Sequence, residues 1–199
     1  MKTIFVGTFL VIASHVLVAQ VSKVAVQSVA TPRAPADCEL ASTDADHTAL
    51  PPSAHAILAS RYKSWKIAAT CKETAQALAA NDTTTTPSVA VGDFDNDASR
   101  DYAVMLERRV WIEWRSLDSV PTNVIIVALL SRGETFLPVF AGGGGEFITR
   151  VARGTRDHNY DTGTYFTHTA DGIYSGTLEK TGGVSIYRDG KFIGVHTVD

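Results

Sequence analysis

The chain has 199 residues, 45% of them hydrophobic and 20% charged, which is long enough for one domain with its own apolar core. This composition, with 15 glycines and 7 prolines, excludes collagen, a coiled coil and a wholly disordered chain. Because 18 Lys and Arg face 21 Asp and Glu, the net charge of -3 predicts no general attraction to nucleic acids or anionic membranes.

The first residues have the pattern of a secretory signal peptide. A single lysine precedes an apolar run over residues 4–19, shorter than the about 20 residues that a membrane-spanning helix needs. We expect cleavage after Ala19, with Ala25 and Ala30 as alternative sites, and a periplasmic or secreted product without a membrane span. Residues 20–52 are rich in Ala, Val, Thr and Pro without a clear period, which predicts a loose N-terminal segment.

The two cysteines, Cys38 and Cys71, both lie in the expected mature chain. In an oxidising compartment two such thiols most simply pair, so we expect a structural disulfide between them. Neither cysteine belongs to a C-x-x-C motif or has a histidine nearby at metal-binding spacing, which argues against zinc binding and redox catalysis.

Two helices are expected ahead of the strand-rich part of the chain. Ser53 follows two prolines and is suited to an N-cap, and apolar residues then recur at helical spacing, which predicts a helix over about 53–64. A second helical stretch at 71–81 follows the short WKIAA run, and TTTTP at 83–87 predicts a turn or linker.

From residue 88 onward apolar and polar residues alternate with a period of two, punctuated by Gly, Pro, Asp and Asn, which predicts β-strands. The expected strands are 88–92, 101–107, 110–114, 123–130, 134–140, 146–152, 162–169, 172–179, 183–188 and 191–198. Asp189 and Gly190 form a strong two-residue hairpin signal, and Asp171 with Gly172 forms a weaker one.

These elements indicate an α+β fold: mainly an antiparallel β-sheet of about seven to ten strands, with one or two N-terminal helices packed on it. The near-continuous apolar strands at 101–106 and 124–130 are expected to be central and covered on both faces, partly by the helices. We expect a single globular domain over 53–199, helical over 53–82 and mainly β over 88–199.

The stretch GDFDNDASRD carries four carboxylates within nine residues, which repel one another unless a cation lies among them. Calcium takes about six to eight oxygen ligands, and acids at alternating positions of a tight loop can direct their oxygens toward one centre. We therefore expect calcium, because an octahedral magnesium site usually keeps several waters; the alternative is a solvated acidic turn. The expected ligands are the side chains of Asp93, Asp95, Asp97 and Asp101 and the backbone carbonyl of Ser99.

The same stretch with its following strand, VGDFDNDASRDYAVML, resembles the calcium loop of FG-GAP or VCBS repeats, whose usual form is G-D-F-N-G-D-G-x-x-D before a hydrophobic strand. The matching residues are Gly92, Asp93, Phe94, Asp97 and Asp101. Asp95 replaces the usual Asn, while Asn96 and Ala98 occupy positions where the family prefers glycine. The resemblance implies calcium binding, but it covers one loop of about 16 residues, and a propeller needs several blades, so a full propeller is not expected.

A Trp-Lys-Ile run (65–67) follows the first expected helix, then comes GDF (92–94), and a Tyr-x-Asp-Gly-Lys-Phe hairpin (187–192) lies near the C-terminus. This order of features is similar to that of small exported bacterial proteins of unknown function with a single such loop, which implies no activity. We expect an exported calcium-binding module, without enzymatic activity, that binds an unknown protein or glycan partner. The alternative is an extracytoplasmic hydrolase on a calcium-stabilised scaffold, with residues such as His158 and Asp161 in its site. Nucleic acid is not an expected partner.

Overall fold

The computed structural model describes residues 38–81, 86–109, 122–178 and 182–198. Its helices are α1 (Asp44–Ala49), α2 (Pro52–Arg61) and α3 (Lys72–Asn81). Its strands are β1 (Lys66–Ile67), β2 (Val89–Gly92), β3 (Asp101–Arg109), β4 (Thr122–Arg132), β5 (Thr135–Gly143), β6 (Phe147–Val151), β7 (Arg156–Asn159), β8 (Thr164–Thr167), β9 (Gly172–Gly176), β10 (Gly182–Arg188) and β11 (Lys191–Val198). The expected signal peptide and the expected strand at 110–114 lie outside the described residues.

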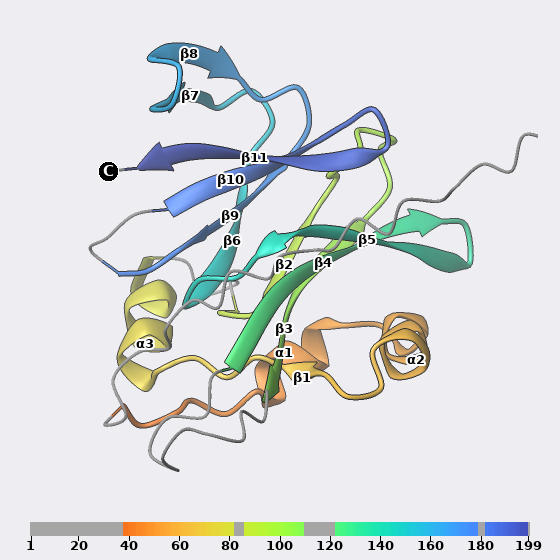
Figure 1. Ribbon diagram of the computed structural model, residues 1–199. Helices are drawn as coiled ribbons and strands as arrows, with labels where there is room; N and C mark the ends of the chain where they lie inside the picture. Colours follow the sequence, from red (N-terminus) through yellow and green to blue (C-terminus); the bar gives the residue numbers. More distant parts are fainter. Residues whose placement is uncertain (1–37, 82–85, 110–121, 179–181, 199) are drawn as a thin grey trace, which may run out of the picture.

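The strands form a central five-stranded sheet, a four-stranded sheet and a two-stranded ribbon, all with antiparallel pairing (Figure 1). In the central sheet the order is β1-β3-β4-β5, and β2 also pairs with β3. The second sheet has the order β11-β10-β9-β6, and β7 pairs with β8. The expected mainly antiparallel α+β architecture is therefore confirmed, although the described residues contain eleven strands and three helices, one more of each than the upper expectation.

Strands β3 and β4 of the central sheet are covered on both faces, as their near-continuous apolar sequences predicted. Ala103 and Met105 of β3 pack in the core between the two larger sheets, whereas Val104 and Leu106 pack against the helices on the opposite face. Successive side chains of a strand point to opposite faces, so a strand between two cores must be apolar at almost every position. Strand β4 alternates in the same way: Val127 packs against the helices, and its neighbours Ile126 and Ala128 pack between the sheets.

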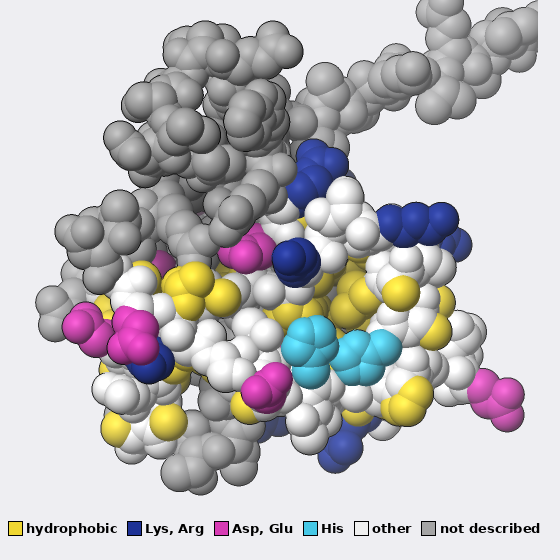
Figure 2. All heavy atoms as spheres, turned by 90° about the horizontal axis from the view of Figure 1, so that it is seen from below, with side chains coloured by type: hydrophobic (Ala, Val, Ile, Leu, Met, Phe, Trp, Pro, Cys, Tyr) yellow, Lys and Arg dark blue, Asp and Glu magenta, His cyan; other side chains and the backbone are white. Residues whose placement is uncertain are grey.

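Helices α1 and α2 cover the outer face of the central sheet, and Figure 2 views the molecule from this side. Helix α2 begins at Pro52, one residue before the expected start, because the fixed φ of proline suits a first helical position. It ends at Arg61 rather than at residue 64. Helix α1 was not expected, and its buried Asp46 accepts a 2.9 Å hydrogen bond from the amide of Ser88, which ties it to the start of β2.

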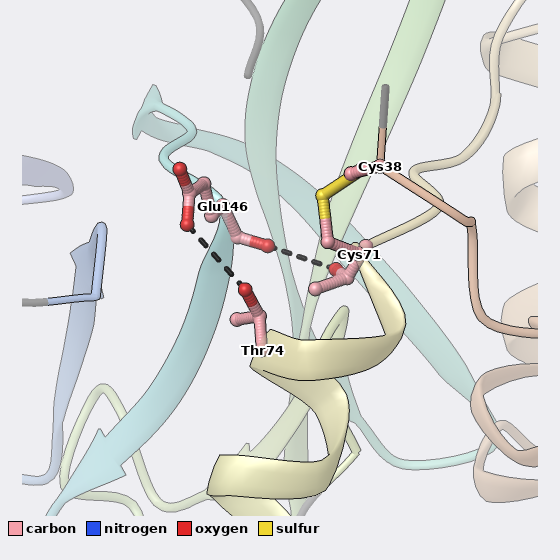
Figure 3. The surroundings of a disulfide bond; sticks show 5 residues. Cys38, Cys71, Thr74 and Glu146 are labelled. Atoms are coloured by element: carbon pink, nitrogen blue, oxygen red, sulfur yellow. Dashed lines mark hydrogen bonds between the residues drawn. A yellow bond between two sulfur atoms is a disulfide. The ribbon is translucent and has the colours of Figure 1, made fainter. Parts of the chain in front are cut away.

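The predicted disulfide is confirmed: Cys38 and Cys71 are bonded, and their Cα atoms lie 5.7 Å apart (Figure 3). The backbone next to the disulfide is paired as well, because Leu40 and Cys71 form an isolated antiparallel β-bridge. On the opposite side, the Thr74 hydroxyl lies 3.5 Å from a carboxylate oxygen of Glu146, the residue before β6 (Figure 3). The segment expected to be loose up to residue 52 is therefore fixed to the domain from Cys38 onward.

The two hairpin signals have different outcomes. Asp189 and Gly190 have φ values of 51° and 81° and connect β10 to β11 in a tight turn, as predicted. The weaker signal at Asp171 and Gly172 is wrong, because β8 and β9 belong to different sheets and the Asp171 carboxylate binds backbone amides instead. Strand β7 was also missed, since its sequence, RDHN, is polar at every position.

Candidate metal site

The acidic loop connects β2 to β3 at an end of the central sheet. Gly92 and Asp101 are partners in the antiparallel register, so the residues that enter and leave the loop lie side by side. This pairing brings together one carboxylate oxygen each from Asp93, Asp95 and Asp101, all within 4.8 Å of one another. Ligand atoms around one calcium ion, at about 2.3–2.6 Å from it, lie at most about 5 Å apart, so the three oxygens fit a common ion.

Phe94 anchors the loop to the interior of the protein. Its side chain is fully buried in the core between the two larger sheets, although its neighbours on both sides are acids. The amide of Phe94 donates a 2.9 Å hydrogen bond to Asp101 Oδ2, and the amide of Ser131 donates a 2.7 Å bond to Asp101 Oδ1. The Asp101 carboxylate therefore holds together the loop, β3 and the end of β4.

The loop backbone wraps around the Asp93 carboxylate. The amides of Asp97 and Ala98 donate to its two oxygens at 2.9 and 3.1 Å. This wrapping requires a left-handed backbone at Asn96 and Ala98, whose φ values are 63° and 64°. These are the two positions at which glycine would be expected from the resemblance, and an alanine there costs about 1 kcal/mol.

Asp95 supplies the strongest local indication of a ligand. Its side chain is only 5% exposed, and Oδ2 accepts a 2.6 Å hydrogen bond from the Arg132 guanidinium. Its other oxygen, Oδ1, is buried and has no hydrogen-bond partner. A buried carboxylate oxygen without a partner is costly, and a metal ion at the three-carboxylate cluster is one way to satisfy it.

Asp97 and Ser99 do not join this cluster through their side chains. Asp97 Oδ1 accepts a 2.8 Å bond from the amide of Ser99, and Asp97 Oδ2 lies 3.2 Å from Arg132 Nη1. The Ser99 amide, helped by the Arg132 charge, lowers the pKa of the Asp97 carboxyl. Of the five predicted ligands, the structure thus brings together three, while Asp97 and the Ser99 carbonyl stay predictions.

The electrostatics of the cluster favour a cation. Burial raises the pKa of Asp101 to about 6, and the negative charges of Asp95 and Asp97 act in the same direction, against its hydrogen bonds from two amides. Arg132, which contacts both Asp95 and Asp97, is the cation that these carboxylates hold. The pKa of the Arg132 guanidinium is raised, chiefly by its hydrogen bond to Asp95.

Three residues that support the loop escaped the sequence-based reasoning: Arg132, Asp171 and Arg153. Asp171 accepts a 3.0 Å hydrogen bond from the amide of Asp93, and its own amide donates to the Asp93 carbonyl at 3.0 Å. A Cβ on Gly92 would lie 2.8 Å from Asp171 Oδ2, so this approach requires glycine. Arg153 donates a 2.7 Å bond to the Asn96 side chain. Asp171, Arg132 and Arg153 are remote in sequence, and no local pattern connects them with the loop.

The residues considered for a hydrolase site lie elsewhere, on the β7–β8 ribbon. The His158 ring packs against Tyr160 and Tyr165, with ring centroids 4.6 and 4.8 Å apart. Asp161 lies 3.8 Å from Nδ1 of His196. Within the described part of the chain, the geometry thus assigns His158 to an aromatic cluster rather than to a pair with Asp161.

Comparison with known proteins adds no further constraint: no family model, curated protein or solved structure matches the chain. Among the described residues, no helix has both the length and the apolar character needed to cross a membrane. The chemistry of the acidic loop therefore rests on its own geometry.

Proposed function

We propose that the protein is an exported calcium-binding module, in which one calcium ion stabilises the β2–β3 loop. The observation that carries this proposal is the buried, unpartnered Oδ1 of Asp95 beside the carboxylates of Asp93 and Asp101. Hard oxygen ligands of this kind suit calcium, whose flexible coordination also accepts backbone carbonyls and water. Asp97 and the Ser99 carbonyl would complete the site.

Calcium in this position would have a structural role. Asp101 binds the end of β4, and Asp93 binds Asp171 at the start of β9, so the loop joins the central sheet to the second sheet. A cation that neutralises these carboxylates would strengthen the junction between the two layers. We propose a non-enzymatic module with a protein or glycan partner, and the disulfide is consistent with a periplasmic or secreted location.

Calorimetric titration of the metal-free protein with calcium tests the proposal. We expect saturable binding of one ion, and a melting temperature that rises with calcium, because ligand at 100 times Kd stabilises the folded state by about 2.7 kcal/mol. Asp95→Asn preserves the side-chain shape and should weaken binding at least about tenfold. Asp161→Asn, on the exposed ribbon, is the matched control and should leave the affinity unchanged.

The proposal would be rejected if millimolar calcium produced neither heat nor a shift in melting temperature. Equal affinity in the wild-type protein and in Asp95→Asn would also reject it, because calcium would then bind elsewhere.

A further inference from the structure

A hollow of about 700 Å³ lies between the helices and the β1 edge of the central sheet. Figure 2 shows this face, where apolar side chains lie between histidine side chains and Lys or Arg side chains. Small-molecule sites commonly measure about 300–1,000 Å³. The hollow belongs to the helix side of the central sheet, and no residue of the acidic loop lines it.

The inner wall of the hollow is apolar. Leu58 of α2, Ile67 of β1 and Leu106 of β3 line it and belong to the helix-side core. Trp65, partly buried, extends this wall toward solvent, and the Arg108 guanidinium lies 4.9 Å from the centre of its ring. A hydrocarbon or aromatic group placed here would be removed from water against an ordered surface.

The rim of the hollow is cationic. Lys63 and Lys66 line it and are exposed, and the one acid among its described lining residues, Glu107, is the cross-strand partner of Lys66. Lysine charges therefore exceed carboxylate charges around the opening. An anionic group at this rim would gain charge-assisted hydrogen bonds while its apolar body rests on the inner wall.

Two histidines complete the rim and fix its shape. The rings of His47 in α1 and His55 in α2 are stacked, with centroids 5.5 Å apart and planes inclined by 11°. Nε2 of His55 donates a 2.9 Å hydrogen bond to the carbonyl of His47, since a carbonyl can only accept. This contact links the two helices at the opening of the hollow.

A second hollow, of about 620 Å³, has a different set of described lining residues. It lies at the glycine-rich end of β5, between the two larger sheets, and the described residues that line it include no Lys, Arg, Asp or Glu. The combination of an apolar wall with excess positive charge therefore distinguishes the hollow beside the helices.

We infer that this hollow binds a small organic anion: a free molecule with a carboxylate or sulfonate group and an apolar body. The anionic group would contact Lys63 and Lys66, and the body would lie against Leu58, Ile67 and Leu106. This site is independent of the proposed calcium site.

The probe is 8-anilinonaphthalene-1-sulfonate, compared with N-phenyl-1-naphthylamine, which has the same rings without the sulfonate. We expect one bound sulfonate per chain with a micromolar Kd, and weaker binding of the neutral compound. Two exposed charge contacts together correspond to about a tenfold difference in affinity. Lys63→Gln combined with Lys66→Gln should therefore weaken binding of the sulfonate about tenfold and leave binding of the neutral compound unchanged. Lys191→Gln, on the β10–β11 hairpin, is the control for the loss of a lysine charge elsewhere on the surface.

Ala59→Trp, which fills the hollow from the exposed side of α2, should abolish binding of both compounds while the thermal unfolding transition stays cooperative. Excess dodecanoate should displace the sulfonate, whereas vesicles of neutral or anionic lipid should not bind the protein. The inference is overturned if the double lysine variant binds the sulfonate as well as the control does. It also fails if the neutral compound binds equally, or if Ala59→Trp has no effect.

Discussion

Replacing Arg132 with glutamine perturbs the acidic loop without removing any carboxylate. In the structure the Arg132 guanidinium binds Asp95 at 2.6 Å and Asp97 at 3.2 Å, and so supplies a positive charge at the place where calcium is proposed. A calcium ion must displace this guanidinium or be repelled by it. In both cases Arg132 opposes calcium binding and supports the metal-free loop.

The size of the effect follows from the burial of the pair. Asp95 is 5% exposed and Arg132 is 38% exposed, so their contact is intermediate between a surface ion pair, worth about 0–1 kcal/mol, and a buried pair, whose disruption costs about 3–5 kcal/mol. We expect Arg132→Gln to destabilise the metal-free protein by about 1.4 kcal/mol. The same free energy should tighten calcium binding about tenfold.

The assay combines urea denaturation of the metal-free protein with calorimetric titration of calcium. Arg153→Gln is the control, because Arg153 contacts the same loop through the neutral side chain of Asn96. It removes one positive charge near the loop, as Arg132→Gln does, and should change the calcium affinity by less than about threefold. With saturating calcium, the stabilities of Arg132→Gln and the wild-type protein should converge.

Unchanged or weaker calcium binding by a cooperatively folded Arg132→Gln protein would refute the competition between guanidinium and ion. An equal gain in Arg153→Gln would refute it too, by showing that the gain reflects overall charge rather than the contact with Asp95.

Three further predictions concern stability. Removing the disulfide with Cys38→Ala and Cys71→Ala should lower the free energy of unfolding by about 2–4 kcal/mol, measured by urea denaturation, because the bridge spans 33 residues; no loss would contradict this. Phe94→Ala should lower the free energy of unfolding by about 3–5 kcal/mol in the same assay and weaken calcium binding, because the side chain that anchors the loop is fully buried. A decrease below about 1 kcal/mol would show that the loop is held by its hydrogen bonds alone. Folding raises the pKa of Asp101 from its ordinary 3.8 to about 6, so in calcium-free buffer this carboxyl should stabilise the protein most below pH 4, and the free energy of unfolding should fall by up to about 3 kcal/mol as pH rises through 6. Saturating calcium should abolish this fall, because it favours the ionised carboxylate. Asp101→Asn, which cannot titrate, is the control.

Much of the secondary structure could be predicted because its signals are local. Alternating apolar residues identified the strand-rich half of the chain, and continuous apolar runs identified β3 and β4 as central, since a strand covered on both faces has no position for a polar side chain. Asp189 and Gly190 predicted their hairpin because both adopt the positive φ that the turn requires. Two cysteines allow a single intramolecular pairing, so the disulfide could be named as well.

The acidic loop could be recognised from its spacing, and its three clustered carboxylates lie within nine residues of one another in sequence. What the sequence could not provide was the surroundings of the loop. Arg132 and Asp171 reach it only because β4 pairs with β3 and β9 approaches from the second sheet, and such long-range neighbours leave no periodic trace.

The proposed anion site illustrates the same limit. Its wall and rim come from α1, α2, β1 and β3, and the short α1 and β1 carried no signal of their own. By itself, then, the sequence determined most of the longer strands, the turn at Asp189, the disulfide and the acidic loop, since these depend on neighbours along the chain. Only the tertiary structure decided which cation faces Asp95 and which side chains surround a hollow, because those neighbours are chosen by strand pairing and by the packing of helices on a sheet.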